Sequence, residues 1–353
     1  MKAAIMEAPG AMPLGDWDTP EPQPGEVKVR VGATGICAGD LYIYKGSNPY
    51  AQYPVIGGHE IAGVIEEVGE GVEGLTVGER VVVEPFIGCG HCYPCRVGKS
   101  NCCMNLRIIG VHRPGGFAEW VAAPAKNIHR VPEGLSLMWA SFAEPIAIAV
   151  QAARRGEIQS GEEALVLGCG PIGLALIEVL RAYGAKIVAT DISPERLETA
   201  AGLGAETLLS GPSLTQEILE RTNGEGMGVV VEATGNTKVM EQTAELVAAG
   251  GRIVILGLAK KGEMVAFPGL DFTRKEMTIV GSRASVNCFP EALRLLLSGA
   301  IHYPKIATEI PMWQAPETFA KLAQNPGAMH KGVLMIEGEM PGLRSYGLGL
   351  RVF

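Results

Sequence analysis

The sequence lacks several features that would place it in particular classes of protein. It has no uninterrupted apolar run of about eighteen residues, the length that a membrane-spanning helix requires. Its N-terminal stretch, "MKAAIMEAPGAMP", has no apolar run long enough for a secretory signal. There is no internal repeat, and there is no excess of positive charge: charged residues make up 19% of the chain, and the net charge is -8. We therefore expect a cytoplasmic protein that binds neither membrane nor nucleic acid.

Cysteine, in contrast, is concentrated in one segment, "CGHCYPCRVGKSNCC". Cys89, Cys92 and Cys95 have CxxCxxC spacing, and the fourth ligand of a metal could be Cys102 or Cys103. Cytoplasmic thiols stay reduced, which argues against a disulfide framework. Four thiolates suit a closed, tetrahedral structural zinc site. An iron–sulfur cluster and unconnected structural thiols are the alternatives, and no further cysteine cluster nearby supports the former.

A second candidate metal site is divided between distant segments. Cys37 and Asp40 lie in "GICAGD", His59 and Glu60 in "GGHE", and Glu144 in the apolar segment "FAEPIAIAV". A thiolate, an imidazole and a carboxylate are the mixed ligand set of a catalytic zinc with an open position. A buried acid such as Glu144 requires a cation, a hydrogen bond or a proton. Asp40 is a candidate acceptor for the ring N–H of His59. The alternative is that each residue is structural.

The middle of the chain carries a dinucleotide-binding pattern. GxGxxG follows the apolar run "ALVLG" and opens a segment of helical periodicity, and an acid lies at the end of the next strand, "KIVATD". That acid, Asp191, would bind a ribose 2′-hydroxyl and favour NAD over NADP, whereas nearby Arg196 could accept a phosphate and weakens the preference. The residues expected at the cofactor are Gly168, Gly170, Pro171, Ile172, Gly173, Asp191, Arg196, Leu256 and Gly257.

Two kinds of periodicity divide the chain. Strands alternate with helical segments over residues 146–284, which predicts a doubly wound parallel sheet of the α/β class. Short β-branched runs broken by glycine and proline dominate residues 1–145, which predicts a mainly antiparallel, barrel-like catalytic domain. We expect residues 285–338 to return to that domain and residues 339–353 to form a separate tail.

These motifs together resemble the zinc-dependent medium-chain dehydrogenase/reductase family over residues 1–338. Its most specific marks are "GHEIAGVIEEVG", "VGKSNCC", "GGFAEW" and the GxGxxG unit. The resemblance implies a GroES-like catalytic domain, a Rossmann domain and a dimer or homotetramer. It also implies that Cys103 is the fourth ligand of the lobe zinc and that Cys37, His59 and Glu60 hold the catalytic zinc. Glu144 would then bond the zinc water or exchange into the coordination shell.

The segment "AEP" around Glu144 looks like the sorbitol, threonine and sugar-acid dehydrogenases, since simple alcohol dehydrogenases usually carry a third cysteine there. Arg283 falls about where sorbitol dehydrogenases place an arginine that faces the substrate, although it could instead form an interdomain ion pair. The chain departs from the family at Gly39, where a serine or threonine usually relays the substrate proton, and at Tyr42, where many relatives keep a histidine.

The sequence therefore predicts an NAD-dependent zinc enzyme that oxidises a secondary alcohol of a polyol, sugar or sugar acid (aldonate). A threonine-type amino-alcohol dehydrogenase and a catalytically silent NAD-binding relative are the alternatives. The residues expected to carry catalysis are Cys37, His59, Glu60, Glu144 and Arg283.

Overall fold

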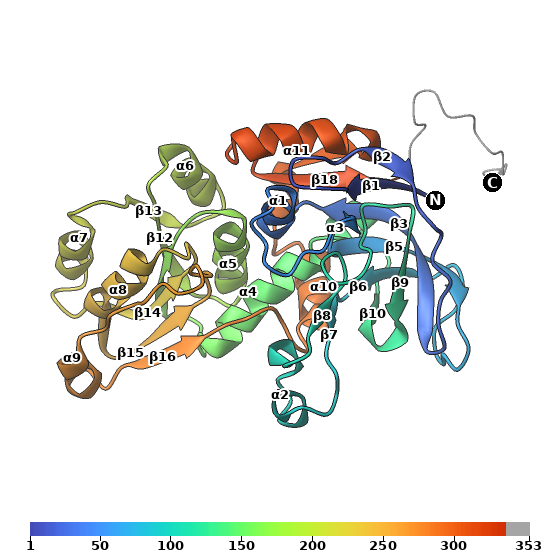
Figure 1. The fold of residues 1–353 in the computed structure, drawn as a ribbon. Coiled ribbons are helices and arrows are strands. Elements are labelled where there is room, and N and C mark those ends of the chain that lie inside the picture. Colours follow the sequence, from blue (N-terminus) through green and yellow to red (C-terminus); the bar gives the residue numbers. More distant parts are fainter. Residues whose placement is uncertain (337–353) are drawn as a thin grey trace.

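The computed structural model describes residues 1–336 and contains two β-sheet regions with helix α4 between them (Figure 1). The tail expected at 339–353 lies outside the described residues. One region holds the middle of the chain, and the other holds its first part together with the strands that follow residue 306. The two-region fold expected from the sequence, a β-rich domain and a doubly wound sheet, is confirmed.

Within the described residues, the middle of the chain forms a six-stranded sheet in which every pairing is parallel. Alternate residues of one central strand enter different cores: Ala164 and Val166 pack with α4 and α5, whereas Leu165 and Leu167 pack with α7 and α8. Burial on both faces explains why these strands are continuous apolar runs. In sheet order the strands are β13 (Glu206–Leu209), β12 (Lys186–Asp191), β11 (Glu163–Leu167), β14 (Met227–Glu232), β15 (Val247–Ile255) and β16 (Thr278–Gly281).

Helices connect these parallel strands and cover the sheet, as a βαβ connection requires. They are α5 (Pro171–Ala182), α6 (Pro194–Gly202), α7 (Leu214–Arg221), α8 (Thr237–Leu246) and α9 (Gly269–Arg274). None of the helices within residues 1–336 is long and apolar enough to cross a membrane.

The larger sheet of the β-rich region is mainly antiparallel and joins both ends of the described chain. Its strands, in order, are β10 (Ile128–Arg130), β6 (Arg80–Val83), β5 (Glu60–Val68), β3 (Glu26–Gly35), β18 (Lys331–Met335) and β17 (Ala307–Pro311), with β9 (Trp120–Pro124) also paired to β3. Because β18 pairs with β3, residues from the end of the described chain lie beside residues near its beginning.

Shorter elements complete this region. The smaller sheets are β2 (Leu14–Asp16), β1 (Lys2–Met6) and β4 (Val55–Ile56), and the pair β7 (Phe86–Ile87) and β8 (Arg107–Ile108). The helices are α1 (Ala38–Tyr44), α2 (Tyr93–Arg96), α3 (Leu137–Ala140), α10 (Phe289–Leu297) and α11 (Ala315–Gln324).

Helix α4 (Ala143–Arg155) connects the two regions. It contacts β5 of the β-rich sheet on one side and α5 of the parallel sheet on the other, and it also packs on α10. Most of its residues are buried for this reason, including the acid Glu144 in its first turn. The helix therefore carries a carboxyl group from the end of the β-rich segment into the space between the two sheets.

Candidate metal centres and cofactor loop

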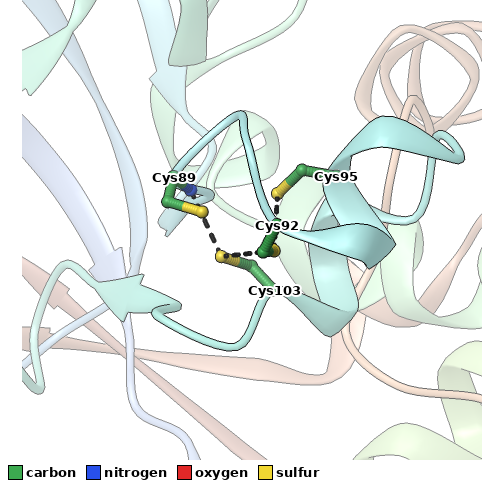
Figure 2. Close-up of side chains that lie close together, drawn as sticks. All are labelled: Cys89, Cys92, Cys95 and Cys103. Atoms are coloured by element: carbon green, nitrogen blue, oxygen red, sulfur yellow. Dashed lines mark hydrogen bonds between the residues drawn. The ribbon is translucent and has the colours of Figure 1, made fainter.

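The four-cysteine lobe is built from a short stretch of chain between β7 and β8. Cys92 precedes α2 and Cys95 lies within it, one turn later, while Cys103 follows the 3-10 turn Ser100–Cys102. Their sulfurs converge with that of Cys89 (Figure 2). The Sγ–Sγ distances are 3.5 Å from Cys92 to Cys95 and 3.7 Å from Cys92 to Cys103.

All four sulfurs of the lobe lie within 4.8 Å of one another, which suits one tetrahedral ion. Cys102 is not a member of this group in the described part of the chain. Every cysteine is a free thiol, so the lobe is not a disulfide framework. Hydrogen bonds from the backbone N–H groups of His91 and Cys92 lower the pKa of the Cys89 thiol to about 6, which favours the thiolate that a metal requires.

The second group comes from the ends of two neighbouring strands. Cys37 caps the N-terminus of α1, just after β3, and Glu60 opens β5, where it lies opposite Gly35. One ligand atom each from Cys37, His59 and Glu60 lies within 4.8 Å of the others. Glu60 is buried, whereas Cys37 and His59 are partly exposed, so the group faces solvent on one side. A mixed set with one accessible side is the arrangement that leaves room for a substrate.

Asp40 organises this second group from inside the protein. It is fully buried, and its carboxylate accepts hydrogen bonds from the N–H of Cys37 at 2.9 Å and the N–H of Gly58 at 3.1 Å. The same carboxylate lies 3.4 Å from Nδ1 of His59, so Nε2 is the ring nitrogen left for a metal. Burial lowers the pKa of His59, but the charges of Asp40 and Cys37 outweigh burial and raise that pKa well above its usual value.

Glu144 lies near this group without belonging to it. Its side chain is 2% exposed, and it is not among the described residues whose ligand atoms lie within 4.8 Å of one another. Its pKa is raised to about 8, chiefly by burial; the positive charges of His59 and Lys331 act to lower it, and the carboxylates of Glu60 and Asp40 act to raise it. The buried acids Asp40, Glu60 and Glu144 and the thiol of Cys37 surround the imidazole of His59 and form an acidic site that favours a bound cation. A zinc ion fits the donor atoms present.

Sequence reasoning missed two buried groups at this site. Lys331 lies 2.5 Å from Glu60. Tyr303 is fully buried, and burial, with the charges of Glu60 and Cys37, raises its pKa well above the usual value. Lys331 is only 4% exposed. A lysine directly before the apolar run "GVLM" was the available signal, since lysine is almost never fully buried without a partner.

The glycine turn after β11 has the geometry of a phosphate-binding loop. Gly168 has a φ of 103°, and a Cβ on Gly173 would lie 1.9 Å from the carbonyl oxygen of Gly168, so both positions require glycine. Gly170 caps the N-terminus of α5, and a Cβ there would meet no described atom within 4 Å. Free backbone N–H groups at that helix end can therefore approach a pyrophosphate, with Pro171 and Ile172 in the first turn.

Asp191 ends β12 beside this loop. Its carboxylate accepts hydrogen bonds from the N–H of Cys169 at 2.8 Å and the N–H of Ser193 at 2.9 Å, and Nη1 of Arg196 lies 3.7 Å away. The acid thus ties the glycine turn to the end of the next strand. The side chain of Arg196 is 42% exposed, so it remains accessible from solvent.

The remaining cofactor candidates lie at the same edge of the parallel sheet. The N–H groups of Leu256 and Gly257 donate to the carbonyl oxygen of Glu232, at 2.9 Å and 3.0 Å. Sequence reasoning missed Glu232, a fully buried acid that accepts from the N–H groups of Thr234 and Gly235. It holds two loops together at the carboxyl ends of β14 and β15, where ligands of such sheets bind.

Arg283 is placed on the linker between β16 and α10. Its side chain is exposed, and its carbonyl oxygen accepts a hydrogen bond of 2.7 Å from the side-chain amide of Asn101 in the four-cysteine lobe. The structure therefore brings the backbone of Arg283 beside the four-cysteine lobe.

Comparison with known proteins identifies both halves of the chain. Residues 23–133 match the alcohol dehydrogenase GroES-like domain, and residues 171–298 match the zinc-binding dehydrogenase family. The chain is 34% identical to the L-galactonate-5-dehydrogenase of Escherichia coli K12, over 95% of this chain and 98% of that protein. It is 38% identical to the L-threonine 3-dehydrogenase of Pyrococcus horikoshii, over 87% and 90% of the two chains.

Solved structures agree with this assignment. The alcohol dehydrogenase rspB of Escherichia coli CFT073, crystallised with the cofactor NADH, superposes with a TM-score of 0.89 at 34% identity, over 95% of this chain and 99% of that one. Sequence relatives that match nearly end to end and a shared fold lead to the same family. The chain belongs to the zinc-containing alcohol dehydrogenases of the medium-chain dehydrogenase/reductase family, enzymes that act on CH–OH groups.

Proposed function

We propose that this enzyme oxidises a secondary alcohol of a polyol, sugar or sugar acid and uses NAD as hydride acceptor. Cys37, His59 and Glu60 hold the catalytic zinc in this proposal, and the four-cysteine lobe holds a structural zinc. The observation that carries it is the thiolate–imidazole–carboxylate group itself, together with the buried acids Asp40 and Glu144. The likeness to L-galactonate-5-dehydrogenase supports the sugar-acid class.

Bound at this group, zinc would act as a Lewis acid that lowers the pKa of a substrate hydroxyl, and NAD would accept the hydride from the same carbon. The protein supplies orientation and proton transfer. Asp40 keeps the ring of His59 in one orientation. Glu144 is a buried acid beside these ligands, and burial raises its pKa, so it is the group that can exchange a proton with the substrate.

The preference for NAD rests on Asp191. Its position at the end of β12, tied to the glycine turn through the N–H of Cys169, suits an acceptor for the ribose 2′-hydroxyl and repels a 2′-phosphate. The NADH in the rspB structure supports the same preference. Arg196 is the residue that could reverse it, because its guanidinium is accessible and near the same place.

Gly39 leaves room for a large substrate beside the candidate metal ligands. A Cβ at this position would lie 3.7 Å from Cε1 of His59 and 3.9 Å from Sγ of Cys37, so the missing side chain leaves space directly beside the metal ligands. A polyhydroxylated substrate can occupy that space and supply its own hydroxyl to the proton relay. Arg283 would bind distal hydroxyls or a carboxylate, provided that the substrate extends to the interdomain linker.

A threonine-type amino-alcohol dehydrogenase is the second candidate, because L-threonine 3-dehydrogenase is among the similar proteins at 38% identity. It would require a site for an ammonium group as well as a carboxylate. A catalytically silent NAD-binding relative is the third candidate, and the intact candidate ligand set argues against it. The family precedent also supports a dimer or homotetramer in the cytoplasm.

NADH formation on a panel of polyols, aldonates, aldoses, threonine and simple alcohols tests the proposal, with NAD and NADP compared. Each assay is repeated after treatment with a chelator and after zinc is returned. We expect zinc-restored activity with NAD on polyols or aldonates. If simple primary alcohols were turned over best, or if threonine alone were turned over, the proposed polyol and sugar-acid substrates would be wrong. Activity that survives loss of the catalytic zinc would overturn the mechanism, as would inactivity on the whole panel with zinc present.

A further inference from the structure

A buried lysine shares the carboxylate of the proposed metal ligand Glu60. The ammonium group of Lys331 donates to Oε1 of Glu60 at 2.5 Å and to the carbonyl oxygen of Ile36 at 2.9 Å. Both charged side chains are almost completely removed from solvent, at 4% and 1% exposed. Solvent screens an ion pair only weakly at such burial, so the charge of Lys331 strongly affects the binding of a second cation by Glu60.

Three adjacent strands create the arrangement. Glu60 begins β5, Gly35 ends β3 directly opposite, and Lys331 begins β18 on the far side of β3. Gly35 is what permits the carboxylate to lie between them, since a Cβ there would come within 1.8 Å of Oε2 of Glu60. The side chain of Glu60 therefore passes over β3 at Gly35, which has no side chain, and contacts the ammonium group of Lys331 from β18.

The second oxygen of Glu60 has no such partner. Oε2 is buried and makes no hydrogen bond to any described residue. Glu60 nonetheless contributes an oxygen that lies within 4.8 Å of the ligand atoms of Cys37 and His59. With Oε1 engaged by Lys331, a single oxygen of Glu60 is left for the metal.

We propose that Lys331 is a positioning residue that keeps Glu60 a one-oxygen, loosely held zinc ligand. The inference rests on the proposed assignment of zinc to Cys37, His59 and Glu60. Lys331 acts in two ways: it occupies one carboxylate oxygen, which prevents chelation of the ion by both oxygens, and its positive charge opposes a divalent cation nearby. Both effects leave a coordination position for the substrate hydroxyl.

Replacement of Lys331 by methionine tests this inference because the variant frees both oxygens and removes the charge. Cobalt is used as the probe, since its visible absorption weakens as coordination number rises. The Cys37→Ser protein provides the spectrum of the lobe alone, and subtraction isolates the second site. Affinity is measured by competition with a chelator. We expect Lys331→Met to bind cobalt at that site at least about tenfold more tightly than the unmodified enzyme, with weaker visible absorption.

Two further lysine variants and a matched control keep the result interpretable. Lys331→Arg retains charge and donors and should bind cobalt as the unmodified enzyme does. Lys331→Gln, which lacks the charge but keeps an N–H donor, should tighten binding less than methionine does and serves if the methionine protein does not fold. Lys28→Met is the control: Lys28 lies 2.5 Å from Glu67 on the same pair of strands, far from Cys37, and its loss should leave cobalt binding unchanged.

The outcomes separate this inference from the proposed function. Unchanged or weaker cobalt binding in both neutral variants would show that Lys331 supports the site structurally, and would overturn the inference while the metal site stood. If Cys37→Ser and the unmodified enzyme bound equal amounts of cobalt, the assignment of the metal to Cys37 would fail, and the inference would fail with it.

Discussion

The two candidate metal-binding groups of this protein differ in how the chain builds them. The lobe has four identical ligands, which come from one short segment and are surrounded by backbone N–H groups. The second group has three different candidate ligands, which come from two strand ends and lie beside the buried ionisable residues Asp40, Glu144 and Lys331. A closed set of thiolates stabilises a loop, whereas a mixed set with an accessible side can bind and activate a substrate. The buried ionisable residues beside the second group can therefore tune how it binds a metal and a substrate.

The largest effect is expected when one cysteine in each group is replaced by serine. Cys37→Ser should lower turnover roughly a thousandfold, because the Lewis acid contributes several kcal/mol to the reaction. Its unfolding temperature should stay near that of the unmodified enzyme. Cys92→Ser should do the reverse: it should lose the lobe zinc and lower the unfolding temperature, because a structural zinc contributes folding energy. Metal analysis, calorimetry and kinetics on both variants would contradict the contrast if the two effects were exchanged.

The next largest effect is expected at Asp40, which has no counterpart in the lobe. Asp40→Asn removes the charge that faces Nδ1 of His59 and should weaken metal binding or turnover roughly 10- to 100-fold. Asp16→Asn is the matched control, because Asp16 pairs with Lys2 at the surface and its side chain is 79% exposed. Equal zinc affinity and equal kcat/KM in the two variants would show that Asp40 does not orient the ring.

The buried acid Glu144 predicts a pH dependence of stability. Its pKa rises from 4.5 to about 8 on folding, chiefly through burial, so the folded protein holds a proton that the unfolded chain has lost. Its contribution to stability is present below pH 4.5 and is lost as the pH rises to about 8. In chelator-treated protein, the unfolding temperature should therefore fall over this range more steeply than in Glu144→Gln. Parallel curves for the two proteins would show that Glu144 is ionised throughout.

The smallest effect concerns substrate size at Gly39. A Cβ at this position makes only ordinary contacts, so serine and alanine both fit. Gly39→Ser should raise the kcat/KM of simple alcohols relative to polyols by roughly tenfold, since it fills space and supplies a hydroxyl for the proton relay. Gly39→Ala separates the two causes, because it fills the space without the hydroxyl. If the ratio of kcat/KM for simple alcohols to kcat/KM for polyols were unchanged in both variants, Gly39 would not determine the substrate class.

Most of the fold could be predicted from the sequence, because it is written in short-range patterns. The alternation of apolar runs and helical periodicity in the middle of the chain predicted the doubly wound sheet, and the glycine spacing predicted the turn that Gly168 and Gly173 form. The site could be predicted only in part. Cys37, His59 and Glu60 were predicted because their side chains are of the types that bind zinc and occur in neighbouring motifs. Nothing in their spacing showed that Glu60 and Gly35 would lie opposite each other.

The sequence by itself determined that Cys89, Cys92 and Cys95 lie together, because only two residues separate each from the next and the chain between them is too short to hold the sulfurs far apart. Its spacing left the choice between Cys102 and Cys103 open, and the fold brings Cys103 to the group. The tertiary structure alone decided what surrounds the second group. Lys331 lies 271 residues from Glu60 along the chain and reaches it through the pairing of β18 with β3. The hydrogen bond from Asn101 to the carbonyl oxygen of Arg283 likewise joins residues that are 182 positions apart. Strand pairing across a sheet is set by the burial of whole faces, so no local pattern encodes which distant charge will stand beside a ligand.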